Sequence, residues 1–196
     1  MKINGTLRQV TLCLLLAGSV WGQASFALQN RYTVYGVDAP VFDSQGVPLA
    51  GTNFRAELWG GATSNSIVPA LDLNRNETRL TVPFLSGGYF FSGSSFFSVP
   101  SDATGGGGSS WLQVRAWDVR LAPTYEEVAG LGLGGYGESL LFFARGSDPF
   151  REPPEPAAPL IGLQSFSLRP VPEPSLWALF ALGGSALWWA ARRRRH

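Results

Sequence analysis

The chain has 196 residues, a net charge of +1 at neutral pH, one cysteine and one histidine. Cys13 lies in an N-terminal apolar run, His196 is the last residue and Lys2 is the only lysine, which excludes a thiolate or histidine metal centre, a Ser-His-Asp triad and a Schiff-base lysine from the central region. Residues 28–170 hold nine arginines and 13 carboxylates, a net charge of about −4. This negative charge does not favour nucleic-acid binding, and we expect no nucleic-acid partner. Because the region also lacks Cys, His and Lys, we expect no cofactor, no metal and no catalytic residue.

The N-terminal segment 1–27 has the organisation of a secretory signal peptide. Two basic residues precede an apolar run from Val10 to Val20, and small residues follow it. The run has the length of a signal-peptide h-region and is too short to span a membrane. We predict a signal peptide that is removed after Ala24 or Ala27, and therefore an exported protein. A buried N-terminal helix is the alternative.

The central region alternates apolar and polar residues with a period of two, which is typical of β-strands. We expect strands at 31–37, 54–60, 78–84, 88–99, 111–119, 138–145 and 160–168. Turns rich in Gly, Ser and Asp separate several of them. The sequence therefore predicts an all-β fold, a small antiparallel β-sandwich over 28–170. One helical turn is expected at 124–129, where Thr124 and Glu127 have the spacing of a capping box.

The strand at 111–119 places aromatic residues on one of its faces. Leu112, Val114 and Ala116 share one face, and Trp111, Gln113, Arg115 and Trp117 share the other. If no second layer covers that face, Trp111 and Trp117 are exposed and can stack on sugar rings. The alternative is that both belong to the core. Exposure predicts a carbohydrate-binding module that acts on extracellular polysaccharide.

Two short segments match functional motifs only in part. Asp72, Asn74 and Asn76 have the alternate spacing of a calcium loop, but Glu77 stands where an EF-hand needs glycine. A polar turn is therefore favoured over an irregular calcium site. The segment 130–137, GLGLGGYG, has the spacing of a dinucleotide fingerprint but precedes an expected strand rather than a helix. We expect a flexible loop there.

Carboxylates also offer possible catalytic pairs, such as Glu126 with Glu127 or Asp118 with Glu138. Two carboxylates are the minimum for glycoside hydrolysis. With 13 of them scattered over a small domain, accidental pairs are common. A secreted hydrolase is therefore the weakest of the functional hypotheses, and we expect a non-enzymatic protein.

Two further segments bear on the organisation of the domain. Residues 148–159 contain five prolines, which fits either a polyproline-II connector or a stiff loop over the sandwich; we favour the loop. Residues 39–58, APVFDSQGVPLAGTNFRAEL, resemble the first hairpin of transthyretin-like and carboxypeptidase-regulatory-like β-sandwiches. This resemblance implies a sandwich and attaches no activity to it.

The C-terminal tail combines an apolar segment with a basic end. Residues 176–191 carry no charge and would form a helix of roughly 24 Å, which spans a bilayer with help from snorkelling and local thinning. The stop-transfer residues Arg192, Arg193, Arg194 and Arg195 follow it. Positive charge remains in the cytoplasm. We therefore predict a transmembrane helix with the β domain outside the cytoplasm.

The order of motifs in this tail resembles the PEP-CTERM sorting signal. Its parts are Val171, Pro172, Glu173 and Pro174, then the apolar helix, then the arginines. The resemblance implies recognition of the Pro-Glu-Pro element by an exosortase, a membrane-embedded cysteine protease-transpeptidase. It also implies a Gram-negative bacterium that makes exopolysaccharide. The alternative is that these prolines only end the domain.

The sequence thus predicts an exported, membrane-anchored surface or extracellular-matrix protein. Its expected partners are an exosortase, membrane lipid and extracellular polysaccharide. It is expected first at the inner membrane and then at the cell surface or in the matrix. The sequence leaves open the molecular activity of the β domain, its oligomeric state and whether the anchor is removed.

Overall fold

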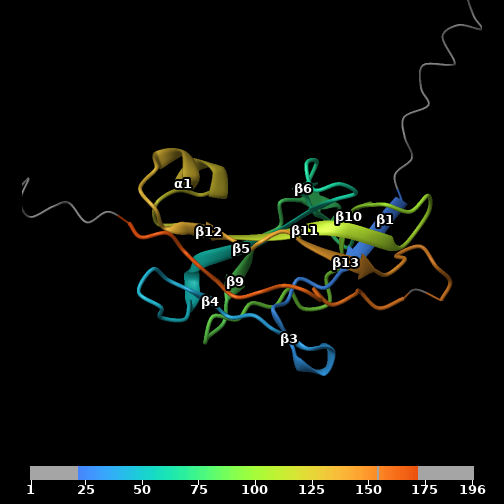
Figure 1. Cartoon of the computed structure of the whole chain (residues 1–196), viewed down its shortest axis with the longest axis horizontal. Helices are drawn as coiled ribbons and strands as arrows, with labels where there is room; N and C mark the ends of the chain where they lie inside the picture. Colours follow the sequence, from blue (N-terminus) through green and yellow to red (C-terminus); the bar gives the residue numbers. More distant parts are fainter. Residues whose placement is uncertain (1–21, 154, 172–196) are drawn as a thin grey trace, which may run out of the picture.

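The computed structural model describes residues 22–153 and 155–171, and most of them lie in strands or in the turns between strands (Figure 1). The strands are β1 (Gly22–Phe26), β2 (Arg31–Tyr32), β3 (Val37–Asp38), β4 (Val41–Phe42), β5 (Gly51–Gly61), β6 (Val68–Pro69), β7 (Leu71–Asp72), β8 (Glu77–Thr78), β9 (Val82–Phe84), β10 (Phe97–Ser101), β11 (Gly108–Asp118), β12 (Tyr136–Glu138), β13 (Phe142–Gly146) and β14 (Phe166–Ser167). The α-helix α1 (Tyr125–Leu131) and the 3-10 turn η2 (Thr33–Tyr35) complete the described elements. The predicted all-β class is confirmed.

Two sheets contain most of these strands. The first has the order β1-β10-β7-β8. The second is built on β5 and β11; β12 and β13 also pair with β11, and β6 and β9 pair with β5. Every pairing in both sheets is antiparallel, whereas the short pair of β14 with β4 is parallel. Figure 1 shows β1, β10 and β13 toward one end of the long axis and α1 and β12 toward the other.

The main core lies where β1 and β10 of the first sheet contact β5 and β11 of the second. Leu112, Val114 and Ala116 point into it and are fully buried, as the alternation in the sequence predicts. A side chain at Gly60 would lie 2.8 Å from Leu112 and 2.9 Å from Val99. Glycine at this position therefore lets β5 and β10 approach closely.

A smaller second core lies under α1. The helix begins with the predicted capping box: the Glu127 amide donates to Thr124 Oγ1 at 3.3 Å, and the Thr124 amide donates to Glu127 Oε2 at 3.2 Å. Tyr125 and Val128 are buried against Trp117 of β11. The helix therefore covers one end of the outer face of the second sheet.

Several predicted strands are shorter than expected. The segment 31–37 is interrupted by η2, because the chain reverses at Gly36 with φ of +74°. The segment 138–145 divides into β12 and β13 at Ser139, whose hydroxyl accepts a hydrogen bond from the Val114 amide at 3.0 Å. Only the last residues of 88–99 join β10, and only two residues of 160–168 form β14.

The predicted flanking helices cannot be compared with the structure. Residues 1–21 and the apolar segment 176–191 lie outside the described residues. Among residues 22–153 and 155–171, no helix has the length and apolar composition that crossing a membrane requires. The last part of the predicted signal segment is described, however, and it forms β1.

Candidate functional site

The last described residues run along the edge of the domain to the start of the predicted sorting signal. Leu160, Leu163 and Leu168 are buried, and they hold this segment against the main core. The Arg169 amide donates to the carbonyl of Tyr136 at 2.8 Å, and the Gly135 amide donates to the carbonyl of Arg169 at 2.8 Å. The segment is therefore fixed to the fold up to the residue before Pro170.

Two glycines form the seat for the end of this segment. Gly134 has φ of +78°, and a Cβ there would lie 1.9 Å from the carbonyl oxygen of Pro170. Gly135 has φ of +75°, and a Cβ there would lie 2.4 Å from the Leu121 side chain and 3.3 Å from the Val171 side chain. The glycine-rich segment 130–137 thus allows close approach of another backbone, which is a structural role that its consecutive glycines could have indicated.

An open pocket lies beside this seat. It has a volume of about 340 Å³, and Asp43, Phe54, Arg120 and Val171 are among its lining residues. Asp118 also lines it and binds Arg120 through both carboxylate oxygens. Burial opposes ionisation of Asp118, but the hydrogen bonds from Arg120 outweigh it and lower the pKa of the carboxyl. Val171 is 44% exposed at the rim of this pocket.

Comparison with known families identifies the segment that begins at this junction. Residues 170–195 match the PEP-CTERM protein-sorting motif. The chain carries a PEP-CTERM sorting signal. This signal indicates exosortase-dependent sorting of an exported or surface protein, with an exosortase as the processing partner and anchoring through the C-terminal region. No curated protein and no solved structure matches the chain.

The PEP-CTERM signal therefore begins at the residue after Arg169, whose backbone hydrogen bonds hold this segment to the domain. Of the predicted motif residues, Val171 is described, whereas Pro172, Glu173 and Pro174 lie outside the described residues, as do Arg192–Arg195. The docking of Pro170 and Val171 places the first motif residue against the domain surface. The sequence predicted the motif directly after the domain at 28–170, and the structure adds the backbone contacts that hold this end of the domain in place.

The predicted sugar-stacking tryptophans have different environments. Trp117 is 1% exposed because α1 covers it, and its indole N–H donates to the carbonyl of Pro123 at 3.3 Å. For Trp117, the structure therefore agrees with the alternative of a core residue and not with an exposed, sugar-stacking position. Trp111 is half-buried, with its ring centroid 5.3 Å from that of Phe143, which is 50% exposed. Trp111 and Phe143 thus form an aromatic pair on this face, with Phe143 the more exposed of the two.

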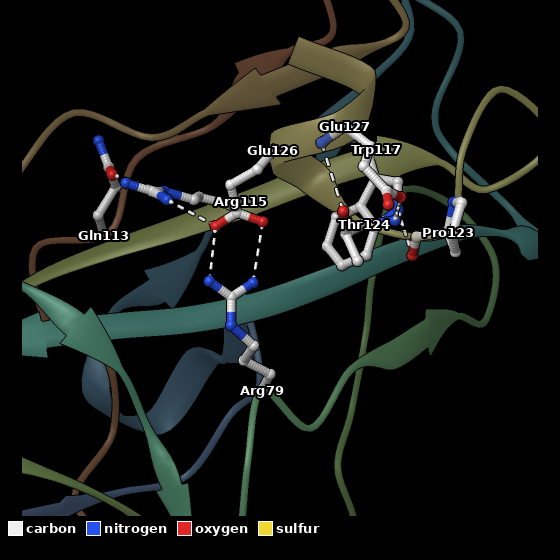
Figure 2. Close-up of polar contacts among 8 residues, drawn as sticks. All are labelled: Arg79, Gln113, Arg115, Trp117, Pro123, Thr124, Glu126 and Glu127. Carbon is white, nitrogen blue, oxygen red and sulfur yellow. Dashed lines mark hydrogen bonds and ion pairs between the residues drawn. The ribbon is translucent and has the colours of Figure 1, made fainter. Parts of the chain in front are cut away.

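Next to Trp117, an ion-pair cluster fixes α1 to the sheet (Figure 2). Arg79 donates to both carboxylate oxygens of Glu126, at 2.9 and 3.0 Å, and Arg115 lies 3.6 Å from the same carboxylate. The guanidinium of Arg115 also lies over the ring of Trp59, 3.8 Å from its centroid. The hydrogen bonds from Arg79 lower the pKa of Glu126, so the carboxylate stays ionised beside its two arginines.

A buried carboxylate lies beneath this cluster. Glu57 is 2% exposed and stands opposite Arg115 in the register of β5 and β11. Its Oε1 atom makes no hydrogen bond within the described part of the chain. Burial raises the pKa of Glu57, and the nearby Trp59 indole and Arg79 offset this only in part. Glu57 lies in the strand expected at 54–60, but a strand pattern does not indicate by itself that this carboxylate is buried.

The carboxylates considered as catalytic pairs make structural contacts. Glu126 binds two arginines, and Glu127 caps α1. Asp118 binds Arg120, and Glu138 accepts a hydrogen bond from the Tyr125 hydroxyl at 2.6 Å. Each side chain thus has a role in holding α1 or the adjacent turn in place.

The segment with calcium-loop spacing is closed by its own side chain. Asp72 is fully buried, and its Oδ1 accepts hydrogen bonds from the amides of Asn74 and Arg75 at 2.8 and 3.4 Å. Such an Asx turn is a common way to stabilise a tight connection. Within the part of the chain that the structure describes, no group of three or more His, Cys, Asp or Glu side chains could hold a metal ion.

Proposed function

We propose that this chain is a non-enzymatic surface or extracellular-matrix protein whose β domain is displayed outside the cell after exosortase processing of its C-terminal signal. The observation that carries the proposal is the junction: the fold is fixed through Arg169, and the matched sorting motif starts at Pro170. The processing enzyme would therefore meet an extended motif directly beside a folded domain. Proline holds the residue before it out of the helical region, which suits an extended recognition segment.

The arrangement of the domain suggests how it is displayed. The described chain leaves the fold at the end occupied by α1 and β12, whereas β1, β10 and β13 lie toward the other end (Figure 1). If the tail is held at a membrane, the α1 end faces the bilayer and the loops beside β1 and β13 face outward. The acidic balance of residues 28–170 favours solubility in the space outside the membrane.

The sequence itself supplies a matched test of motif recognition, because the tripeptide Pro-Glu-Pro occurs twice, at 154–156 and at 172–174. In the first copy, Glu155 accepts a hydrogen bond from the Asp148 amide at 3.2 Å and pairs with Arg151. Its carboxylate is therefore engaged within a loop of the domain. Only the second copy lies in the matched sorting motif.

Replacement of each Pro-Glu-Pro copy by three alanines, one copy at a time, should show which copy the processing enzyme recognises. In a host with an exosortase, the 172–174 variant should accumulate unprocessed in the membrane fraction, and the 154–156 variant should mature like the wild type. Intact mass and membrane fractionation measure both outcomes. If the 172–174 variant matures normally, the motif acts only as a linker and the proposal fails.

A second candidate function is binding of extracellular polysaccharide through Trp111 and Phe143. The observation in its favour is that Phe143 remains half exposed beside Trp111 on the outer face of the second sheet, with Leu141 also exposed. Alanine at Trp111 and Phe143 together should weaken retention of the purified domain on polysaccharide from the producing cells. Leu85→Ala, at another exposed apolar position, is the control. Equal retention of the wild-type domain, the Trp111 and Phe143 double variant and Leu85→Ala would reject this candidate.

A further inference from the structure

Strand β1 is an integral part of the folded domain, although the sequence assigns it to the signal peptide. It pairs with β10 at five consecutive positions, from Gly22 opposite Ser101 to Phe26 opposite Phe97. Ala24 and Phe26 are fully buried in the main core. The first described residues are therefore as well integrated into the fold as the central strands.

The other edge of β1 is also bonded to the domain. Ser25 and Ser147 exchange backbone hydrogen bonds at 2.9 and 3.2 Å, and their hydroxyl oxygens are 3.0 Å apart. The amide of Ala27 donates to the carbonyl of Ala158 at 2.8 Å. β1 thus lies between β10 on one side and the segment that leads into the proline-rich loop on the other.

Cleavage at either of the two predicted positions would damage this arrangement. Cleavage after Ala27 would remove the whole strand, leaving β10 unpaired along one edge and the Phe26 site empty. Cleavage after Ala24 would create an ammonium group on Ser25, which is fully buried. An ammonium group without solvent or a counter-charge is strongly disfavoured.

An earlier position avoids both difficulties. Gln23 is half-buried rather than buried, and its amide nitrogen lies 3.1 Å from the carbonyl of Gly105. An ammonium group there would belong to a residue that is not fully buried and would have a hydrogen-bond acceptor in the carbonyl of Gly105. Gly22 supplies the small residue required before the cleaved bond, and Ala17 with Ser19 supplies a second small-residue pattern upstream.

We propose that signal-peptide cleavage occurs at or before the Gly22–Gln23 bond, so that β1 remains in the mature protein. Water is added across the cleaved peptide bond, leaving a carboxylate on the upstream residue and an ammonium group on the downstream one. The proposal rests on export of the chain, which is part of the proposed function. It is independent of exosortase processing at the other end.

The test expresses the full chain in a Gram-negative host that has general secretion but no exosortase. A failure of C-terminal processing then cannot affect the result. N-terminal sequencing and intact mass of the exported protein should give a start at Val20 or Gln23, or at another residue before Ala24. A start at Ser25 or Leu28, or retention of Met1, would overturn the proposal.

A stability measurement on the exported protein tests the structural reason. Phe26→Ala should lower the unfolding temperature by roughly 10 °C, because it empties a fully buried aromatic site of a domain of this size. Gln29→Ala, just beyond the strand and only half-buried, is the control and should change it little. Equal unfolding temperatures for both variants would show that β1 is not part of the mature fold, which also overturns the proposal.

Discussion

Substitution of Gly134 by alanine tests whether the C-terminal segment is seated on the glycine loop. The new Cβ would lie 1.9 Å from the carbonyl oxygen of Pro170, so the segment from Arg169 onward has to move away. Gly132 provides the matched control. It also has a positive φ, +64°, but a Cβ there would meet nothing within 4 Å.

The two variants share one energetic cost and differ in a second. Alanine in a left-handed conformation costs about 1 kcal/mol relative to glycine, and both variants carry this cost. Gly134→Ala should also lose the hydrogen bonds between Arg169 and Tyr136 and between Gly135 and Arg169, at about 1 kcal/mol each. We therefore expect about 1 kcal/mol of destabilisation for Gly132→Ala and about 3 kcal/mol for Gly134→Ala.

Urea unfolding of the exported domain measures this difference directly. Hydrogen exchange at the amides of Gly135 and Arg169 measures the local effect, and both amides should lose protection in Gly134→Ala alone. Equal destabilisation of the two variants, with equal protection of both amides, would refute the idea that Gly134 seats the segment.

The remaining predictions concern burial, pH and the membrane anchor. Burial raises the pKa of Glu57, so the ionised carboxylate destabilises the folded state. Glu57→Gln should therefore increase the free energy of unfolding at pH 7, by about 1.4 kcal/mol for each unit by which the pKa is raised, and with it the unfolding temperature. This gain should vanish below pH 4.5, where Glu57 is protonated in both the folded and the unfolded chain. A gain that persists at pH 4 would contradict this explanation. Trp117→Ala should cost about 3–5 kcal/mol in urea unfolding because Trp117 is buried under α1, and Trp111→Ala should cost clearly less; the reverse order would contradict the burial of Trp117. Glutamine at Arg192–Arg195 should reduce the share of the protein in the membrane fraction, because four guanidinium groups resist transfer through hydrocarbon; an unchanged share would show that the arginines do not retain it.

Sequence patterns predicted those strands and helices for which the local sequence preference and the contacts made in the folded domain favour the same structure. The strict alternation in 111–119 corresponds to β11, and the capping box of Thr124 and Glu127 corresponds to the start of α1. The prediction of a single strand over the aromatic segment 88–99 was wrong. Its positive-φ glycines, Gly88 and Gly93, turn the chain, so that Phe90 and Phe91 form isolated bridges and the strand β10 begins at Phe97.

Tertiary contacts account for the features that the patterns missed. Glu57 is buried in β5 opposite Arg115, whose guanidinium also pairs with Glu126 of α1, and nothing in the local sequence around Glu57 indicates that a helix packs on the neighbouring strand β11. Similarly, the small residues of Gly22–Phe26 fit the pattern of a signal-peptide cleavage site, and they also fit a strand that packs closely on its neighbours. Only the pairing with β10 distinguishes these two interpretations.

The thin attachment of the C-terminal segment has a mechanical consequence. If the tail is held in a membrane while the domain is pulled away, tension enters the fold at Val171. It is carried first by the backbone hydrogen bonds of Arg169 with Tyr136 and Gly135, and then by the short pair of β14 with β4. These contacts lie one after another along an edge, so they would open in sequence rather than together. Peeling residues 160–171 would lengthen the tether by roughly 40 Å. The long pairing of β5 with β11 lies outside this path. A displayed domain of this kind would absorb shear by extending its stalk before its centre unfolds.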